Sequence, residues 1–194
     1  MGLTVSATVL VGCSSPTAIR TSVAIPSVGQ FVGPYADAFA SHYRDATSEF
    51  AQEALGDGEI SEAEFAESLS RFKRCLADSG ITMTVFNFDG SYSTKSDPSV
   101  SSDEGHAIAT RCSRSSDEDL IVSLYTWVRQ NPRNEDENKL VAACLASEGV
   151  VPSTFTGEHY SEALETGDLP FGDDPRAQTV LASCRMDPLG LEPK

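Results

Sequence analysis

A cysteine near the N-terminus is the residue whose surroundings most clearly predict chemistry. The tripeptide Leu-Val-Gly at residues 10–12 ends a short apolar run directly before Cys13, and a Ser/Thr/Pro-rich stretch follows. This order is typical of a bacterial lipobox, in which the cysteine thiol is the nucleophile that takes diacylglycerol. Residues 1–12 are then a signal peptide, excluded from fold reasoning, and Cys13 is the lipidation site and the mature N-terminus.

Two other interpretations of this N-terminus stay open. Residues 1–5 carry no lysine or arginine, whereas an export signal normally begins with one, so a start further upstream or a plain secretory signal is an alternative. Gly2 and Ser6 also fit the pattern of N-myristoylation. Because no apolar run reaches about 18 residues, we expect no segment to span a membrane.

Four further cysteines lie within an internal repeat. Residues 75–81 and 144–150 share the pattern Cys-Leu-Ala-x-x-Gly followed by a β-branched residue, and residues 108–112 resemble 180–184 more loosely. The offsets between the paired segments are 69 and 72 residues. A duplicated unit of roughly 70 residues explains both offsets, with two cysteine-bearing helices in each unit.

The repeat predicts which cysteines are bonded to each other. An even number of cysteines in an exported chain indicates disulfides, and the repeat selects Cys75–Cys112 and Cys144–Cys184. A zinc site of four thiolates would need closely spaced pairs, but the shortest spacing is the 32 residues from Cys112 to Cys144. Redox catalysis is disfavoured because the chain has no C-x-x-C motif.

The elements that must position these cysteines are mostly helices. Apolar residues at helical spacing and capping signals predict the following helices: 34–55, one that begins at the Ser61/Glu64 capping box, one from about 102, and others over about 117–131, 134–148, 157–165 and 174–185. The first two should form a helical hairpin. Residues 81–88 and 91–95 alternate like strands around Asp89-Gly90, which predicts a β-hairpin with a type I′ turn.

The fold class that follows is mostly α with one small β-hairpin, a disulfide-stapled helical domain with two pseudo-repeats. We expect a tether over 13–33, a single domain over 34–188 and a tail over 189–194. The two repeat units should cover about 60–115 and 130–187.

The helix over 117–131 carries the only tryptophan, Trp127. Leu120, Leu124 and Val128 share its face, so we expect Trp127 at the centre of the core, with Thr126 on a different side. The alternative is an exposed helix that binds a partner, for which tryptophan is a common anchor.

The formal net charge of −15 limits the class of partner. Affinity for nucleic acid depends on lysine and arginine, so no nucleic-acid partner is expected. An anionic bilayer would also repel this surface, and the lipid would have to hold the protein at the membrane.

The other motifs have simple structural explanations. Residues 53–64 resemble part of an EF-hand loop, but Leu55 falls where a calcium ligand is required. His42, His106 and His159 are scattered, and acidic runs lie where helices begin, where the helix dipole favours them. We therefore expect no catalytic residue, no metal ligand and no cofactor, although a carboxylate pair for glycoside hydrolysis has no spacing rule.

The lipobox, the cysteine repeat, the acidic segment over 57–65 and the Asn131-Pro132 helix stop resemble those of uncharacterised exported lipoproteins of actinobacteria, over residues 34 to 188. The resemblance implies an accessory protein attached to the cell envelope and suggests no catalytic residues.

These observations favour a non-enzymatic, lipid-anchored envelope protein that binds another protein or a peptide. The alternative is an extracytoplasmic enzyme or metal-binding protein that uses acidic residues. A concave pocket in which several carboxylates of raised pKa converge would favour the alternative.

Overall fold

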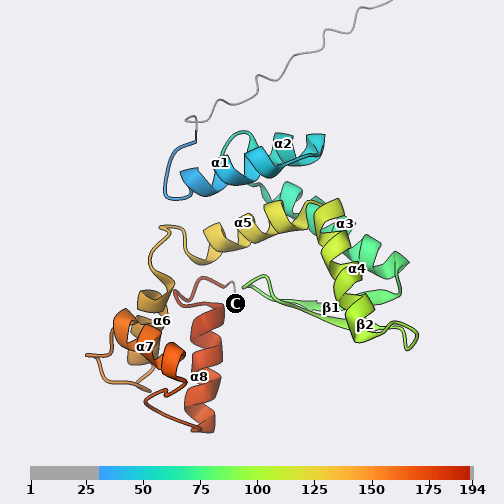
Figure 1. The fold of residues 1–194 in the computed structure, drawn as a ribbon. Helices are drawn as coiled ribbons and strands as arrows, with labels where there is room; N and C mark the ends of the chain where they lie inside the picture. Colours follow the sequence, from blue (N-terminus) through green and yellow to red (C-terminus); the bar gives the residue numbers. More distant parts are fainter. Residues whose placement is uncertain (1–30, 193–194) are drawn as a thin grey trace, which may run out of the picture.

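The computed structural model describes residues 31–192 and is mostly helical, with one two-stranded antiparallel sheet (Figure 1). This confirms the predicted fold class. The elements, in chain order, are α1 (Ala36–Asp45), α2 (Glu49–Leu55), α3 (Glu62–Asp78), β1 (Ile81–Phe86), β2 (Tyr92–Ser96), α4 (Ser102–Ser115), α5 (Glu118–Gln130), α6 (Glu137–Ser147), α7 (Gly157–Thr166) and α8 (Pro175–Met186). None of the described helices is long and apolar enough to cross a membrane. Cys13, the expected signal peptide and most of the tether lie outside the described residues.

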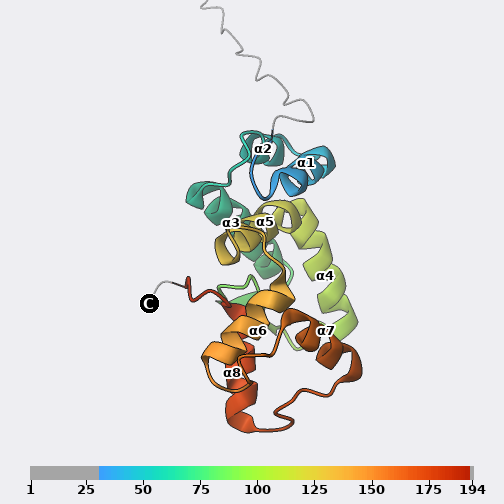
Figure 2. The ribbon, with the colours of Figure 1, turned by 90° about the vertical axis from the view of Figure 1, so that its left-hand side faces the viewer.

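Three clusters of buried side chains divide the elements into two lobes. The N-terminal lobe comprises α1–α5 and the hairpin, and α5 contributes to both of its clusters: Ile121 and Leu124 to the one with α1 and α2, and Val122 to the one with α3, β1 and α4. The C-terminal lobe comprises α6–α8, whose buried side chains form a cluster of their own. Figure 2 shows the three C-terminal helices grouped in the lower part of the view.

Each lobe contains one of the two predicted disulfides. Cys75–Cys112 joins α3 to α4, and Cys144–Cys184 joins α6 to α8, with Cα–Cα distances of 5.5 and 5.7 Å. Both pairings inferred from the repeat are therefore confirmed. The segment between the two helices differs, because it is the hairpin in the first case and α7 in the second.

The predicted first helix is wrong in one respect, because the chain breaks between α1 and α2. Ala46 is buried and extended, with ψ of 121°, and Ser48 then caps α2 by accepting a hydrogen bond from the Ala51 N–H. The break lets both short helices pack on α5. The segments expected to pair as a helical hairpin each pack against α5, and α2 and α3 meet where the Arg71 guanidinium lies over the Phe50 ring.

The predicted β-hairpin exists, but its turn is not type I′. Only Gly90 of the two turn residues has a positive φ, of 80°, and its N–H donates to the Asn87 carbonyl. This is the arrangement of a type I turn followed by a left-handed glycine. A bulge between Met83 and Val85 then shifts the alternation, so that Phe86 packs in the core while Val85 is exposed.

Candidate functional site

The position of Trp127 corrects the core prediction made from the sequence. Its side chain is 49% exposed, and Thr126, expected elsewhere, is buried. Thr126 lies against the hairpin turn, where a Cβ on Gly90 would come within 3.1 Å of its methyl group, and its hydroxyl donates to the Val122 carbonyl. The hairpin and α4 cover one side of α5, and α1 and α2 cover another; Trp127 touches α1 only at the edge of this second contact, through the His42 ring, and half of its surface stays exposed.

Trp127 lines a cleft with a volume of 720 Å³ between the end of α5 and the C-terminal lobe. The aromatic and apolar side chains that line it are Tyr35, Trp127, Leu140, Tyr160, Leu164 and Pro188. Charged side chains, Asp89, Glu135, Glu137 and Arg185, also contribute to the lining. Leu164 is 45% exposed, so the cleft presents accessible apolar surface from α5 and from α7.

Tyr35 attaches the beginning of α1 to the end of α5 beside Trp127. Its hydroxyl lies 3.0 Å from the Trp127 carbonyl oxygen and 2.9 Å from that of Asn131, within donating distance of both. Burial raises the pKa of the Tyr35 phenol, so this group stays a proton donor. The hydroxyl thereby fastens the end of α5 to the start of α1, and it holds the backbone under Trp127 in place.

The opposite wall of the cleft is held by Arg185 of α8. Its Nε donates to the Tyr160 hydroxyl at 2.8 Å, and its guanidinium lies 5.9 Å from the centre of the Tyr160 ring. Gln130 connects the two walls, because its side-chain amide donates to the Met186 carbonyl at 2.6 Å.

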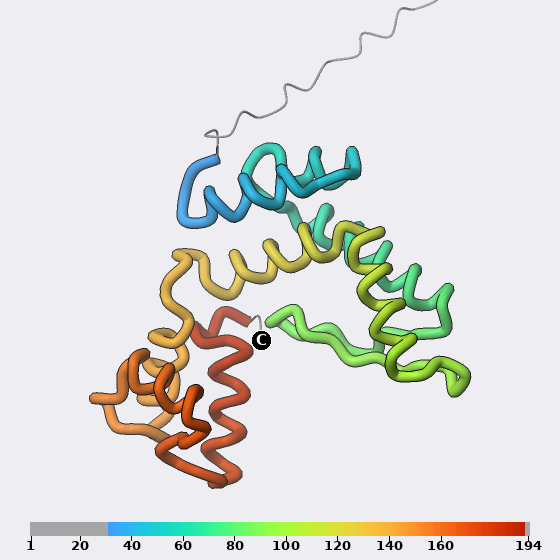
Figure 3. The backbone as a smooth tube through the Cα atoms, viewed as in Figure 1, coloured from blue at the N-terminus to red at the C-terminus, as the bar shows by residue number. Residues whose placement is uncertain are grey.

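The segment 131–136 is the covalent connection between the lobes, and Figure 3 traces it from α5 into α6. The Asn131 side chain bridges it, donating to the Glu135 carbonyl at 2.7 Å and accepting from the Glu135 N–H at 3.0 Å. Asn134, whose φ is 51°, donates to the Pro34 carbonyl at 2.9 Å. These bonds order the floor of the cleft before any ligand binds.

Some aromatic rings near the end of α5 have an arginine stacked on them, and within the described part of the chain Trp127 has none. The Arg129 guanidinium lies over the Phe88 ring at 4.2 Å and near the Tyr125 ring at 5.6 Å. The Trp127 ring meets the edge of the His42 ring, with 5.8 Å between the two centres. Within residues 31–192, no lysine or arginine stacks on Trp127.

The histidines considered as candidate ligands are far apart in the structure. The Nδ1 of His42 lies 2.8 Å from the Ala38 carbonyl oxygen, and that of His159 accepts from the Thr156 N–H in the capping of α7. His106 lies on α4. Among the described residues, no group of three or more His, Cys, Asp or Glu side chains could hold a metal ion.

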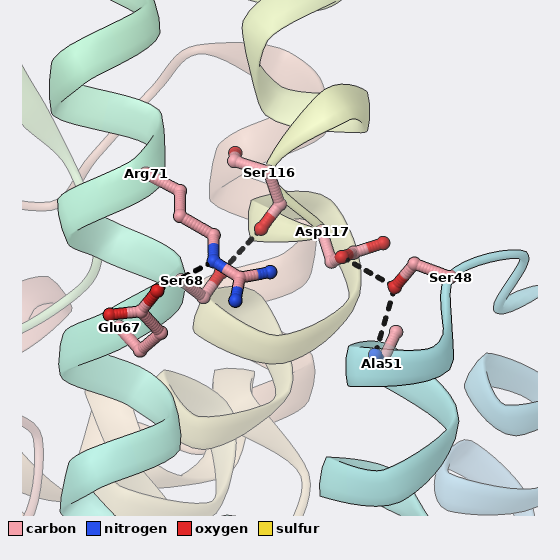
Figure 4. Close-up of polar contacts among 7 residues, drawn as sticks. All are labelled: Ser48, Ala51, Glu67, Ser68, Arg71, Ser116 and Asp117. Carbon is pink, nitrogen blue, oxygen red and sulfur yellow. Dashed lines mark hydrogen bonds and ion pairs between the residues drawn. The ribbon is translucent and has the colours of Figure 1, made fainter.

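A buried polar junction that the sequence did not suggest lies where α4 meets α5 (Figure 4). Asp117, 6% exposed and with φ of 58°, accepts a hydrogen bond of 2.7 Å from the Ser48 hydroxyl. Ser68 of α3 donates to the Ser116 carbonyl at 3.0 Å. The Ser48 hydroxyl also caps α2, so one side chain joins the start of α2 to the start of α5.

Glu118, the next residue, is a partly buried carboxyl. Burial raises the pKa of Glu118, the neighbouring Asp119 raises it further, and a hydrogen bond of 2.5 Å from the Ser113 hydroxyl lowers it. Glu118 does not line the Trp127 cleft.

Comparison of the chain with protein-family models, with curated proteins and with solved structures gives no match. The candidate site therefore rests on its own geometry.

Proposed function

We propose that this protein is a non-enzymatic, lipid-anchored protein of the cell envelope that binds another protein or a peptide in the Trp127 cleft. The observation that carries the proposal is a half-exposed tryptophan, the only one in the chain, at a cleft with preordered walls. Tryptophan, tyrosine and arginine are the residues that most often dominate binding energy in protein interfaces. All three types line this cleft.

The cellular location has two separate supports. The two disulfides indicate folding in an oxidising compartment. Attachment by diacylglycerol at Cys13, with residues 13–33 as the tether, rests on the lipobox.

A catalytic or metal-binding role for the acidic residues has less support. That role would be favoured by several carboxyls of raised pKa converging in the cleft. Glu118, whose pKa is raised, lies outside the cleft and is hydrogen-bonded to Ser113. The proposal therefore assigns binding, and no chemical step, to this site.

Site-specific photo-crosslinking tests the binding role. A photoreactive amino acid is placed at Leu164 in the full-length protein in its native cells, and at Val85 as a control of similar exposure outside the cleft. We expect a discrete adduct from position 164 that is absent from position 85 and is lost when Trp127→Ala is added. Identical adducts from both positions, or adducts unaffected by Trp127→Ala, would contradict the proposal.

Substitution of the lipobox cysteine tests the anchor. Cys13→Ala should release the protein into the medium or leave an unprocessed precursor, which cell fractionation and the apparent mass distinguish. A mature-sized Cys13→Ala protein that stays with the membranes would show that the lipid is not what holds it there.

A further inference from the structure

We propose that the segment bound in the Trp127 cleft is basic, and that it places a lysine or arginine side chain on the indole of Trp127. This inference rests on the proposed binding function and names the chemistry of the partner.

The first argument comes from the arginines of the protein itself. Arg71 lies 3.9 Å above the Phe50 ring, Arg129 stacks on Phe88, and Arg185 lies near Tyr160. The N-terminal lobe and the cleft wall thus already pair cations with aromatic rings. Trp127, the ring type that binds cations best, has no such partner among residues 31–192. A cation from another molecule would complete the same arrangement.

The second argument is electrostatic. Three carboxylates and one arginine line the cleft, so its lining is net negative, as the whole chain is at −15. Glu135 is partly neutralised by Arg133 at 2.6 Å, whereas Glu137 makes no ion pair within the described residues. A positive side chain beside Trp127 would meet complementary charge, and an acidic one would be repelled.

The third argument concerns the shape of the bound side chain. Lysine and arginine carry an apolar stem behind the charged group. Trp127 and Leu164 offer apolar surface from two different helices, and Glu137 adds a carboxylate to the lining of the same cleft. The apolar lining of the cleft can therefore contact the stem while the charged end lies against the indole.

Peptide binding tests the inference directly, because Trp127 is the only tryptophan and its fluorescence reports this cleft alone. Three N-acetylated, C-amidated decapeptides alternate alanine with lysine, glutamine or glutamate. We expect the lysine peptide to change the emission with a Kd about tenfold lower than the glutamine peptide, and the glutamate peptide to bind more weakly still. The advantage of the lysine peptide should shrink as salt is raised.

Variants of the protein show whether the lysine peptide binds at Trp127 or is attracted by the overall negative charge of the chain. With fluorescein-labelled lysine peptide and anisotropy as the readout, Trp127→Leu should raise the Kd about tenfold and Trp127→Phe less, because phenylalanine keeps a ring. Glu137→Gln should raise it about threefold. Glu158→Gln, which removes an acidic residue from the first turn of α7 outside this cleft, is the matched control and should leave the Kd unchanged.

The outcomes distinguish the inference from the function on which it rests. The inference of a basic partner would be wrong if the glutamine and lysine peptides bound with equal affinity. It would also be wrong if the lysine peptide did not bind while Leu164 still gave its crosslink, or if Trp127→Leu left the Kd of the lysine peptide unchanged. Equally tight binding of spermidine or N-acetyl-lysine amide would assign the cleft to a small cation and also overturn it. If position 164 gives no crosslink that depends on Trp127, the proposed binding function itself is wrong.

Discussion

At the scale of single residues, the exposure of a side chain decides how much it contributes to the stability of the fold. Trp127 and Leu124 lie on the same helix, α5, yet Leu124 is fully buried against α1 and α2, while Trp127 faces the cleft. Removal of the larger side chain should therefore have the smaller effect on stability.

Trp127→Ala should lower the free energy of unfolding by about 1–2 kcal/mol, because about half of the side chain is already exposed to solvent. Leu124→Ala is the control and should cost about 2–5 kcal/mol by leaving a cavity. Urea unfolding followed by circular dichroism measures both values. Equal losses would return Trp127 to the core and remove it from the proposed site.

Glu118 should make stability depend on pH. Its pKa is raised in the folded state, so its contribution is fully present below the ordinary pKa and is lost as the pH rises through the folded value. Glu118→Gln keeps an acceptor for Ser113 and removes the charge, so the variant should gain stability relative to wild type as the pH rises through this range. Ser113→Ala should steepen the decline, because it removes the hydrogen bond that lowers the pKa. Urea midpoints between pH 4 and 8 that run parallel for all three proteins would contradict this prediction.

At the scale of elements, a few buried polar contacts determine how short helices join longer ones. α2 has only 7 residues, too few to be stable alone, and its N-cap Ser48 is tied to the buried Asp117 at the start of α5. The left-handed conformation of Asp117 then directs the chain from α4 into α5.

Ser48→Ala should therefore cost about 1.5–3 kcal/mol, the sum of a lost cap and an unpaired buried carboxylate. Ser61→Ala, at the exposed capping box of α3, is the matched control and should cost about 1 kcal/mol. Denaturant unfolding measures both, and a cycle with Asp117→Asn isolates the link between the two residues. Equal costs for Ser48→Ala and Ser61→Ala would mean that the Asp117 contact adds nothing.

At the scale of the whole molecule, two lobes with separate clusters of buried side chains are held together by the 131–136 segment and by contacts such as Gln130 to Met186. Each lobe has its own disulfide, with sequence separations of 37 and 40 residues. Unfolding of one lobe should therefore leave the other largely intact.

Replacement of Cys144 and Cys184 by serine should destabilise the C-terminal lobe by about 3–4 kcal/mol, the loop-closure entropy of the bridge. Hydrogen exchange followed by mass spectrometry should show faster exchange in α6 and α8, with α3 and α5 unchanged. The reciprocal pair, Cys75 and Cys112 to serine, should reverse the pattern. Uniform acceleration along the chain would show one cooperative unit.

Most of the secondary structure and both disulfides could be predicted from the sequence, because their causes are local or repeated. The capping box of Ser61 and Glu64 begins α3 as expected, and Asn131 ends α5. The shared pattern around Cys75 and Cys144 carried enough information to pair all four cysteines of the described chain correctly.

The candidate site could not be predicted, because it depends on which faces of α5 the other elements cover. Helical spacing groups Trp127 with Leu124, but spacing does not show that the hairpin turn reaches Thr126 or that α1 covers only part of Trp127. The break at Ala46 and the left-handed conformation of Asp117 likewise depend on contacts of α1 and α2 with α5, which lies far from both in the sequence. The chain by itself thus determined its helices, its bridges and its charge, whereas tertiary packing decided which side chains face the cleft, since burial depends on contacts between residues far apart in the sequence.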